Sequence, residues 1–138
     1  MDLRFWKFVP LALVLCGIAL CALVILGCKG DVVVDSYAQM MEARRQVRMR
    51  DEDFRRARQE HKDDCANANV TPEERSGSLA RALDVMSKYN EKVEEYNNKA
   101  ARMLTEEVRR KAQGYGEELL ASYKRRENAD IPPCNPPN

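Results

Sequence analysis

The sequence has little from which a catalytic site is built. It holds a single histidine, His61, in 138 residues, and no glycine-rich loop of the kind that binds phosphate. The serines have no base at a spacing known from nucleophilic enzymes; they are Ser36, Ser76, Ser78, Ser87 and Ser122. We therefore predict a protein that is not an enzyme, with no cofactor, no metal ion and no small-molecule substrate.

An excess of charge is also missing from most of the chain. The formal net charge is +1, and it arises at the head, where Arg4 and Lys7 outnumber Asp2. From Lys29 onward the basic and acidic residues balance one another and alternate over short distances. Nucleic-acid binding needs an excess of Lys and Arg on one face, whereas mixed signs are typical of solvated helix surfaces. We expect no nucleic-acid partner.

One long stretch near the start of the chain has no charged residue at all. It lies between Lys7 and Lys29 and consists almost wholly of apolar residues. At about 1.5 Å per helical residue, residues 8–28 would span roughly 30 Å, the thickness of the hydrocarbon layer of a membrane. Basic and aromatic residues, among them Arg4 and Trp6, precede it and suit the headgroup region. This pattern predicts membrane insertion.

The end of this stretch, "ILGC", resembles the lipobox of bacterial lipoproteins. The resemblance covers the first 28 residues, places Gly27 before the cleavage point and implies that Cys28 becomes the lipid-modified first residue. The thiolate of Cys28 is a nucleophile that can take a diacylglyceryl group. The bulky Leu26 and the length of the apolar run favour an uncleaved transmembrane anchor instead. Both fates stay open, and both place the protein on a membrane.

The charges that flank the predicted anchor indicate its orientation. The head is basic, whereas the residues that follow the span carry Lys29 against Asp31, Asp35 and Glu42. Because positive flanks stay in the cytoplasm, we expect the body to lie outside the cytoplasm, anchored to the inner or the outer membrane.

The rest of the chain has the apolar spacing of long helices. No Gly or Pro interrupts residues 31–70, and the pattern predicts one helix from about Val33 to Asn67. "NANVTPEER" then supplies a turn and the start of a second helix, with Thr71 and Glu74 forming a capping box. We expect a hinge at Gly114–Gly116 and a short third helix near Glu117–Arg126, followed by an extended proline-rich tail over residues 129–138.

Two helices in an antiparallel hairpin have a single seam in which to bury apolar side chains. Either the third helix folds back to cover this seam, or the body associates with a partner or with further copies. We take the central apolar residues of both helices as the candidate interaction stripe: Met40, Val47, Phe54, Met86, Tyr89, Val93 and Tyr96.

The second helix repeats a Tyr-Asn pair at a spacing of seven, as Tyr89-Asn90 and Tyr96-Asn97 in "KYNEKVEEYNNKA". This phrase of about a dozen residues resembles one in the LemA family of bacterial membrane-anchored helical proteins. The family has an N-terminal span followed by long helices, which is the architecture that the resemblance implies here. The simplest interpretation is that the tyrosines pack in the seam and the asparagines flank it and fix its register.

The polar residues His61, Cys65 and Cys134 are the remaining candidates for a site. His61 and Cys65 lie on one helical face, but zinc usually takes four ligands and no second pair is near in the sequence. Outside the cytoplasm Cys65 and Cys134 could oxidise. A bond within the chain requires a fold at Gly114–Gly116 that returns the tail to Cys65, and a bond between chains is the alternative.

We therefore predict an all-α envelope protein with three parts: a signal peptide or anchor (1–28), a coiled-coil-like helical hairpin (29–128) and a tail (129–138). The hairpin would bind a protein partner or further copies of itself. The layout is also similar to that of phage inner-membrane spanins, which implies a role in lysis. A further alternative is an accessory subunit of an envelope or secretion complex.

Overall fold

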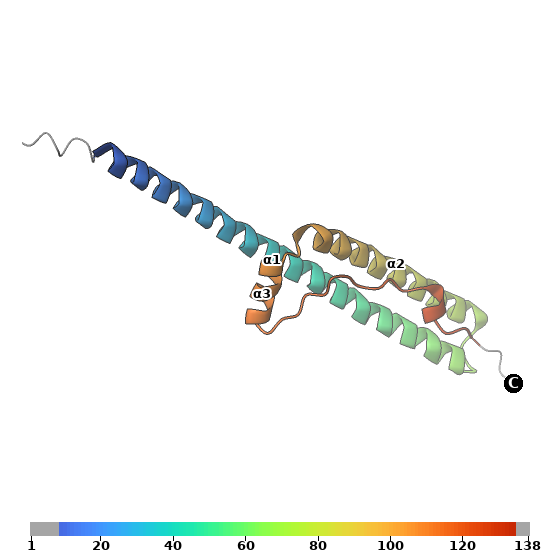
Figure 1. The fold of residues 1–138 in the computed structure, drawn as a ribbon. Helices are drawn as coiled ribbons and strands as arrows, with labels where there is room; N and C mark the ends of the chain where they lie inside the picture. Colours follow the sequence, from blue (N-terminus) through green and yellow to red (C-terminus); the bar gives the residue numbers. More distant parts are fainter. Residues whose placement is uncertain (1–8, 135–138) are drawn as a thin grey trace, which may run out of the picture.

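The computed structural model describes the backbone of residues 9–134 and the side chains of residues 32–134. These residues form no strand and three α-helices, with α1 at Val9–Ala66, α2 at Pro72–Met103 and α3 at Glu106–Gly114. A short 3-10 helix, η2, follows at Asn128–Asp130. Helices α1 and α2 pack side by side as a hairpin, and the chain after α3 returns along them (Figure 1). The prediction of an all-α hairpin is confirmed for these residues.

Helix α1 continues without interruption because no Gly or Pro breaks it after Gly30. Its largest buried side chains recur every seven residues, which keeps them facing α2; they are Met40, Val47, Phe54 and His61. The helix ends at Ala66, one residue before the predicted end. Asn67 begins the turn, and its Oδ1 accepts a hydrogen bond of 3.0 Å from the backbone N–H of Asn69.

The capping box predicted at the start of α2 is confirmed. The backbone N–H of Glu74 donates to Thr71 Oγ1 (3.2 Å), and the N–H of Thr71 donates to Glu74 Oε2 (2.8 Å). The hydrogen bond from the Thr71 backbone holds the pKa of the Glu74 carboxyl below its usual value. Such caps stabilise a helix by about 1 kcal/mol, so the turn between the two long helices is well specified by its own residues.

The predicted interaction stripe lies inside the hairpin. Its seven residues are at most 8% exposed, and they pack in two adjoining clusters along the seam; they are Met40, Val47, Phe54, Met86, Tyr89, Val93 and Tyr96. The Phe54 and Tyr89 rings stack at 6.5 Å between centroids. These side chains form the core of the chain itself, so a surface for a partner must be sought elsewhere on the body.

The second half of the chain bends earlier than predicted. Helix α2 ends at Met103, and Thr105 caps a separate helix, α3, by accepting a hydrogen bond from the backbone N–H of Val108 (3.3 Å). Helix α3 turns away from α2 and packs across α1, burying Val108 and Ala112 (Figure 1). The apolar spacing continues through this bend, which is why periodicity alone missed it.

The short helix predicted at Glu117–Arg126 is wrong, because these residues are extended. Helix α3 ends in a Schellman motif, in which the N–H of Glu117 donates to Ala112 O and the N–H of Gly116 donates to Gln113 O. Gly116 has a φ of 71°, a left-handed conformation that glycine adopts at little cost. The motif turns the chain back toward the far end of the hairpin.

Within the part of the chain that the structure describes, no helix is both long and apolar enough to cross a membrane. The stretch for which the sequence predicts insertion, residues 8–28, lies outside the side chains that the structure describes. The same is true of Cys28, the candidate for lipid modification. Both assignments therefore stay predictions.

Candidate functional site: an extended strap held by two Tyr-Asn pairs

Residues 117–134, which we call the strap, run along the hairpin from α3 to the turn that joins α1 and α2 (Figure 1). Leu119 and Ile131 of the strap are 6% and 7% exposed and belong to the two core clusters. The Tyr123 ring packs edge-on against that of Tyr96, at 4.8 Å between centroids. The seam of the hairpin is thus covered by the chain folding back on itself, although as an extended segment and not as a helix.

The side chains of Asn90 and Asn97 hold the backbone of the strap. Asn90 Nδ2 donates to Arg126 O (2.9 Å), and Asn90 Oδ1 accepts from the Arg126 N–H (2.8 Å). Asn97 repeats the arrangement on Tyr123, with distances of 3.0 Å and 2.8 Å. Each amide therefore satisfies both polar backbone groups of one strap residue, as a neighbouring strand would do in a sheet.

The tyrosine of each pair adds a third hydrogen bond to the strap. The Tyr89 hydroxyl donates to Lys124 O (3.1 Å), and the Tyr96 hydroxyl donates to Leu120 O (2.7 Å). Both tyrosine rings remain in the core, where Tyr89 is 4% exposed and Tyr96 is fully buried. The buried rings therefore satisfy their hydroxyl groups on the strap backbone.

The spacing of the two pairs fits an extended chain. Seven helical residues, from Asn90 to Asn97, rise by about 10.5 Å. Three residues, from Tyr123 to Arg126, cover about 9–10 Å in an extended conformation. Two successive asparagines of the heptad can thus reach two strap residues that lie three apart. These bonds go to backbone atoms, so this face of α2 recognises an extended conformation more than a particular sequence.

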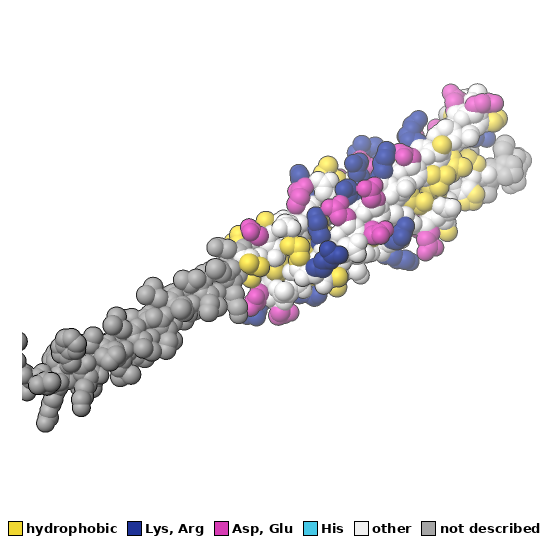
Figure 2. All heavy atoms as spheres, turned by 90° about the horizontal axis from the view of Figure 1, so that it is seen from above, with side chains coloured by type: hydrophobic (Ala, Val, Ile, Leu, Met, Phe, Trp, Pro, Cys, Tyr) yellow, Lys and Arg dark blue, Asp and Glu magenta, His cyan; other side chains and the backbone are white. Residues whose placement is uncertain are grey.

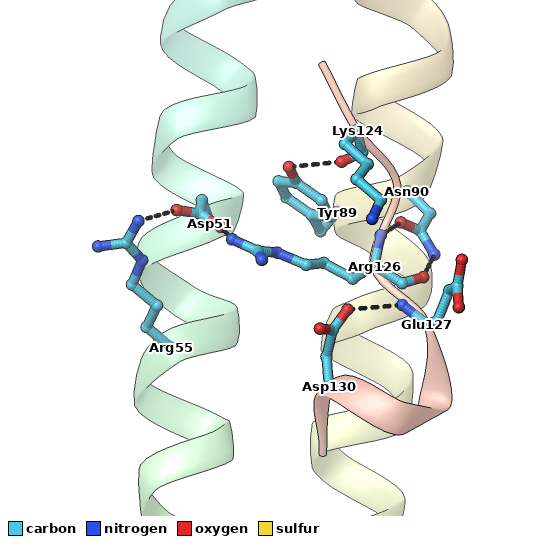
Figure 3. Close-up of polar contacts among 8 residues, drawn as sticks. All are labelled: Asp51, Arg55, Tyr89, Asn90, Lys124, Arg126, Glu127 and Asp130. Atoms are coloured by element: carbon cyan, nitrogen blue, oxygen red, sulfur yellow. Dashed lines mark hydrogen bonds and ion pairs between the residues drawn. The ribbon is translucent and has the colours of Figure 1, made fainter.

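Arg126 ties the strap to α1 across the seam (Figure 3). Its Nη2 lies 2.9 Å from Asp51 Oδ1, and Arg55 approaches the other carboxylate oxygen at 2.7 Å. The Arg126 guanidinium also lies over the rings of Phe54 and Tyr89, at 5.9 and 5.7 Å. Its hydrogen bond to Asp51 raises the pKa of Arg126 above the usual value, so the guanidinium stays charged at any ordinary pH.

Two further links fasten the ends of the strap. At the beginning, the Arg44 side chain of α1 donates a hydrogen bond to the Glu117 carboxylate and forms an ion pair with it. This hydrogen bond raises the pKa of Arg44. At the far end, Cys134 forms a disulfide with Cys65 of α1, with 5.0 Å between the Cα atoms. Of the two arrangements that the sequence leaves open, the structure contains the bond within the chain.

His61 lies beside this disulfide at the far end of the hairpin. It is 2% exposed, and its Nδ1 lies 3.0 Å from Ser78 Oγ of α2. Its Nε2 lies 3.5 Å from Cys65 Sγ and 3.9 Å from Cys134 Sγ. The sequence places only His61 and Cys65 together, and the fold adds Cys134 from a position 69 residues farther along the chain.

Burial of Tyr96 predicts a loss of stability at alkaline pH. Burial raises the pKa of Tyr96 to about 12 from its ordinary value of 10.0. Below about pH 10 the hydroxyl is protonated in both states and the full stability is present; between about pH 10 and 12 only the unfolded chain releases the proton. We expect the free energy of unfolding to fall by up to about 2 kcal/mol across this window, measured by urea titrations followed by circular dichroism.

A Tyr96→Phe variant is the control for this pH dependence. It lacks the titrating hydroxyl, so its free energy of unfolding should depend less steeply on pH over the same window, although its stability near neutrality is lower because the bond to Leu120 O is lost. Equal slopes for the two proteins would show that Tyr96 does not cause the effect.

The residues that fasten the strap are only partly evident from the sequence. The Tyr-Asn repeat is visible, and its tyrosines do pack in the seam as predicted. Its asparagines, however, do not set the register between two helices but bind the strap, which is a correction of the simplest interpretation. Arg126 had no signal that distinguished it from the other basic residues.

Comparison with protein-family models, with curated proteins and with solved structures finds no match for this chain. The functional argument therefore depends on the geometry of the strap and of the hairpin.

Proposed function

We propose that this chain is a non-enzymatic envelope protein that a membrane anchor holds at the bilayer and whose rigid helical hairpin binds a protein partner outside the cytoplasm. One observation carries the proposal. Helix α1 has 58 residues and continues without a break from the predicted anchor to the far end of the hairpin (Figure 1). The anchor itself, the lipobox-like end at Cys28 and the outward orientation come from the sequence pattern.

The length of α1 supports a spacer role. At about 1.5 Å per residue, its 58 residues extend for about 87 Å. A bilayer would take up roughly 30 Å of this length, so the remainder would hold the far end of the hairpin more than about 50 Å from the membrane. The strap, the Asp51–Arg126 pair and the disulfide all brace this projecting part.

A surface at the far end suits a protein partner. A groove of about 600 Å³ lies there between the start of α2 and the end of the strap. Leu79 and Leu83, which line it, are 39% and 36% exposed, and Ile131 and Pro132 form its other wall. Figure 2 shows charged side chains of both signs interspersed over the body and hydrophobic ones gathered toward this end. Exposed apolar patches with a polar rim are typical of protein contacts.

The anchor is tested in bacterial cells that express the full chain. We expect the protein in the membrane fraction, where alkaline carbonate does not extract it. Metabolic labelling with palmitate, compared with a Cys28→Ala variant, separates the two fates of the anchor: label that depends on Cys28 indicates a lipoprotein, and no label indicates a retained helix. Recovery of the unprocessed chain in a detergent-free soluble fraction would overturn the proposal.

The same cells test the partner surface. A photo-crosslinking residue at Leu83 should give a discrete adduct, whereas the same residue at Asn98, which is exposed on the same helix away from the groove, should not. An adduct of twice the mass of the chain would indicate self-association, and a different mass a separate partner. Equal yields at both positions would show that the groove is not the contact.

A further inference from the structure

Three side chains that bind soft metal ions converge at the far end of the hairpin. His61 and Cys65 come from α1, and Cys134 comes from the end of the strap. One donor atom from each, a histidine nitrogen and two sulfurs, lies within 4.8 Å of the others. His61 is 2% exposed, so its ring has a fixed position in the core.

The hydrogen bonds around His61 determine which nitrogen is free. The Ser78 hydroxyl donates to Arg75 O (3.0 Å), so its oxygen is left to accept a bond from His61 Nδ1 (3.0 Å). The proton of a neutral His61 ring therefore lies on Nδ1, and the lone pair of Nε2 is directed toward the two sulfurs at 3.5 and 3.9 Å. Metal-binding histidines are commonly oriented in this way by a second hydrogen bond.

The distances from the His61 nitrogen to the two sulfurs suit a metal ion, whereas the two sulfurs, which are joined in the disulfide, have to separate on reduction to act as two ligands. In tetrahedral zinc sites with Zn–N of about 2.0 Å and Zn–S of about 2.3 Å, the nitrogen and sulfur ligands are roughly 3.5 Å apart. The distances from Nε2 to the two sulfurs are close to this value. Two thiolates would also neutralise a divalent charge, which favours an ion in a partly buried position.

We propose that the reduced chain binds one thiophilic d10 cation, Zn²⁺ or Cu⁺, through His61 Nε2 and the thiolates of Cys65 and Cys134. A dithiol or phosphine reductant supplies two electrons to the disulfide, which takes up two protons and becomes two thiols. Binding of the cation then releases these two protons. The metal-bound dithiolate and the disulfide are alternative states of the same two sulfurs, and each links the end of the strap to α1. This site is independent of the proposed function.

The proposal is tested on the full chain in detergent micelles. Cys16, Cys21 and Cys28 are replaced by alanine, so that Cys65 and Cys134 are the only thiols. After reduction with a phosphine, Co²⁺ is titrated as a spectroscopic probe for Zn²⁺, and chromophoric chelators compete for Zn²⁺ and for Cu⁺ in parallel. We expect one ion per chain, thiolate-to-Co²⁺ charge-transfer bands and the visible bands of a tetrahedral ion, whose fourth ligand would be water. The oxidised chain should show none of these signals.

Matched variants assign the ligands. Cys134→Ser and His61→Asn each remove one ligand, and the asparagine keeps an N–H that can donate to Ser78. The affinity for the metal ion should fall by at least about 100-fold in each variant. Ser78→Ala keeps all three ligands and removes only the orienting bond, so a smaller loss of about 10- to 100-fold is expected. Circular dichroism checks that the helices are retained.

Binding of either cation with this pattern supports the proposal. The proposal is overturned if the reduced chain binds neither Zn²⁺ nor Cu⁺. It is also overturned if His61→Asn binds them as tightly as the parent chain does, because the thiols alone would then account for the binding.

Discussion

Loss of the Cys65–Cys134 disulfide is expected to lower the free energy of unfolding by about 4 kcal/mol. The two cysteines are 69 residues apart, and the loop-closure model assigns about this value to a closed loop of such length. The effect arises mainly in the unfolded chain, whose freedom the bond restricts. The contacts of the strap with Asn90, Asn97 and Asp51 do not require the bond. We therefore expect the reduced protein to keep its native fold at lower stability.

The measurement compares the free energy of unfolding of the oxidised chain with that of a Cys65→Ser/Cys134→Ser variant. Urea titrations are monitored by circular dichroism, and a chelator is present throughout. The single variant Cys65→Ser should lose as much as the double variant, since either change removes the same bond. The oxidised and chemically reduced parent chains provide a second pair for the comparison. A difference below about 1 kcal/mol would contradict the loop-closure estimate and would indicate that residual structure already restricts the unfolded chain.

The long helices could be predicted from the sequence because their signals are local. The capping box of Thr71 and Glu74 needs only four consecutive residues, and the turn at Asn67 follows from the same short stretch. The heptad spacing of Met40, Val47 and Phe54 correctly predicts which face of α1 is buried. Local pattern thus predicts the hairpin and most of its core.

The strap could not be predicted in the same way because its conformation depends on contacts with α2, which is distant from it in the sequence. Glu117–Arg126 is rich in good helix formers, and Leu119 and Tyr123 have a helical spacing. The asparagines on α2 satisfy the backbone groups of Tyr123 and Arg126 that a helix would otherwise pair internally, and Leu119 packs in the core. Tertiary contacts therefore override the intrinsic preference of this segment.

The same dependence on contacts distant in the sequence explains why His61, Cys65 and Cys134 lie together. His61 and Cys65 are a turn apart on one helix and are evident from the sequence, whereas Cys134 joins them only because the strap is extended. The strap is extended over residues 117–127, before η2. These eleven residues would cover about 17 Å as an α-helix and about twice that distance in an extended conformation. An extended strap can therefore reach from α3 to the far end of the hairpin, where a helix would end well short of it.

The replacement of both asparagines by alanine is expected to release the middle of the strap. Asn90→Ala/Asn97→Ala removes four hydrogen bonds to the strap backbone. At about 1 kcal/mol for each bond, the strap should lose roughly 4 kcal/mol of local stability, less whatever water restores to the freed backbone groups. Helices α1 and α2 keep their shared core, and the disulfide still holds Cys134, so the loss is local and not global.

Amide hydrogen exchange measures this local loss directly. In the parent chain the amides of Tyr123 and Arg126 donate to Asn97 and Asn90, so they should be protected from exchange. In the double variant a local loss of about 4 kcal/mol would lower their protection by about three orders of magnitude. Asn98→Ala is the matched control, because Asn98 is exposed on the same helix and makes no bond to the strap. Unchanged protection of residues 120–127 in the double variant would show that apolar contacts alone hold the strap, because the amides that should have been freed would still be shielded from water.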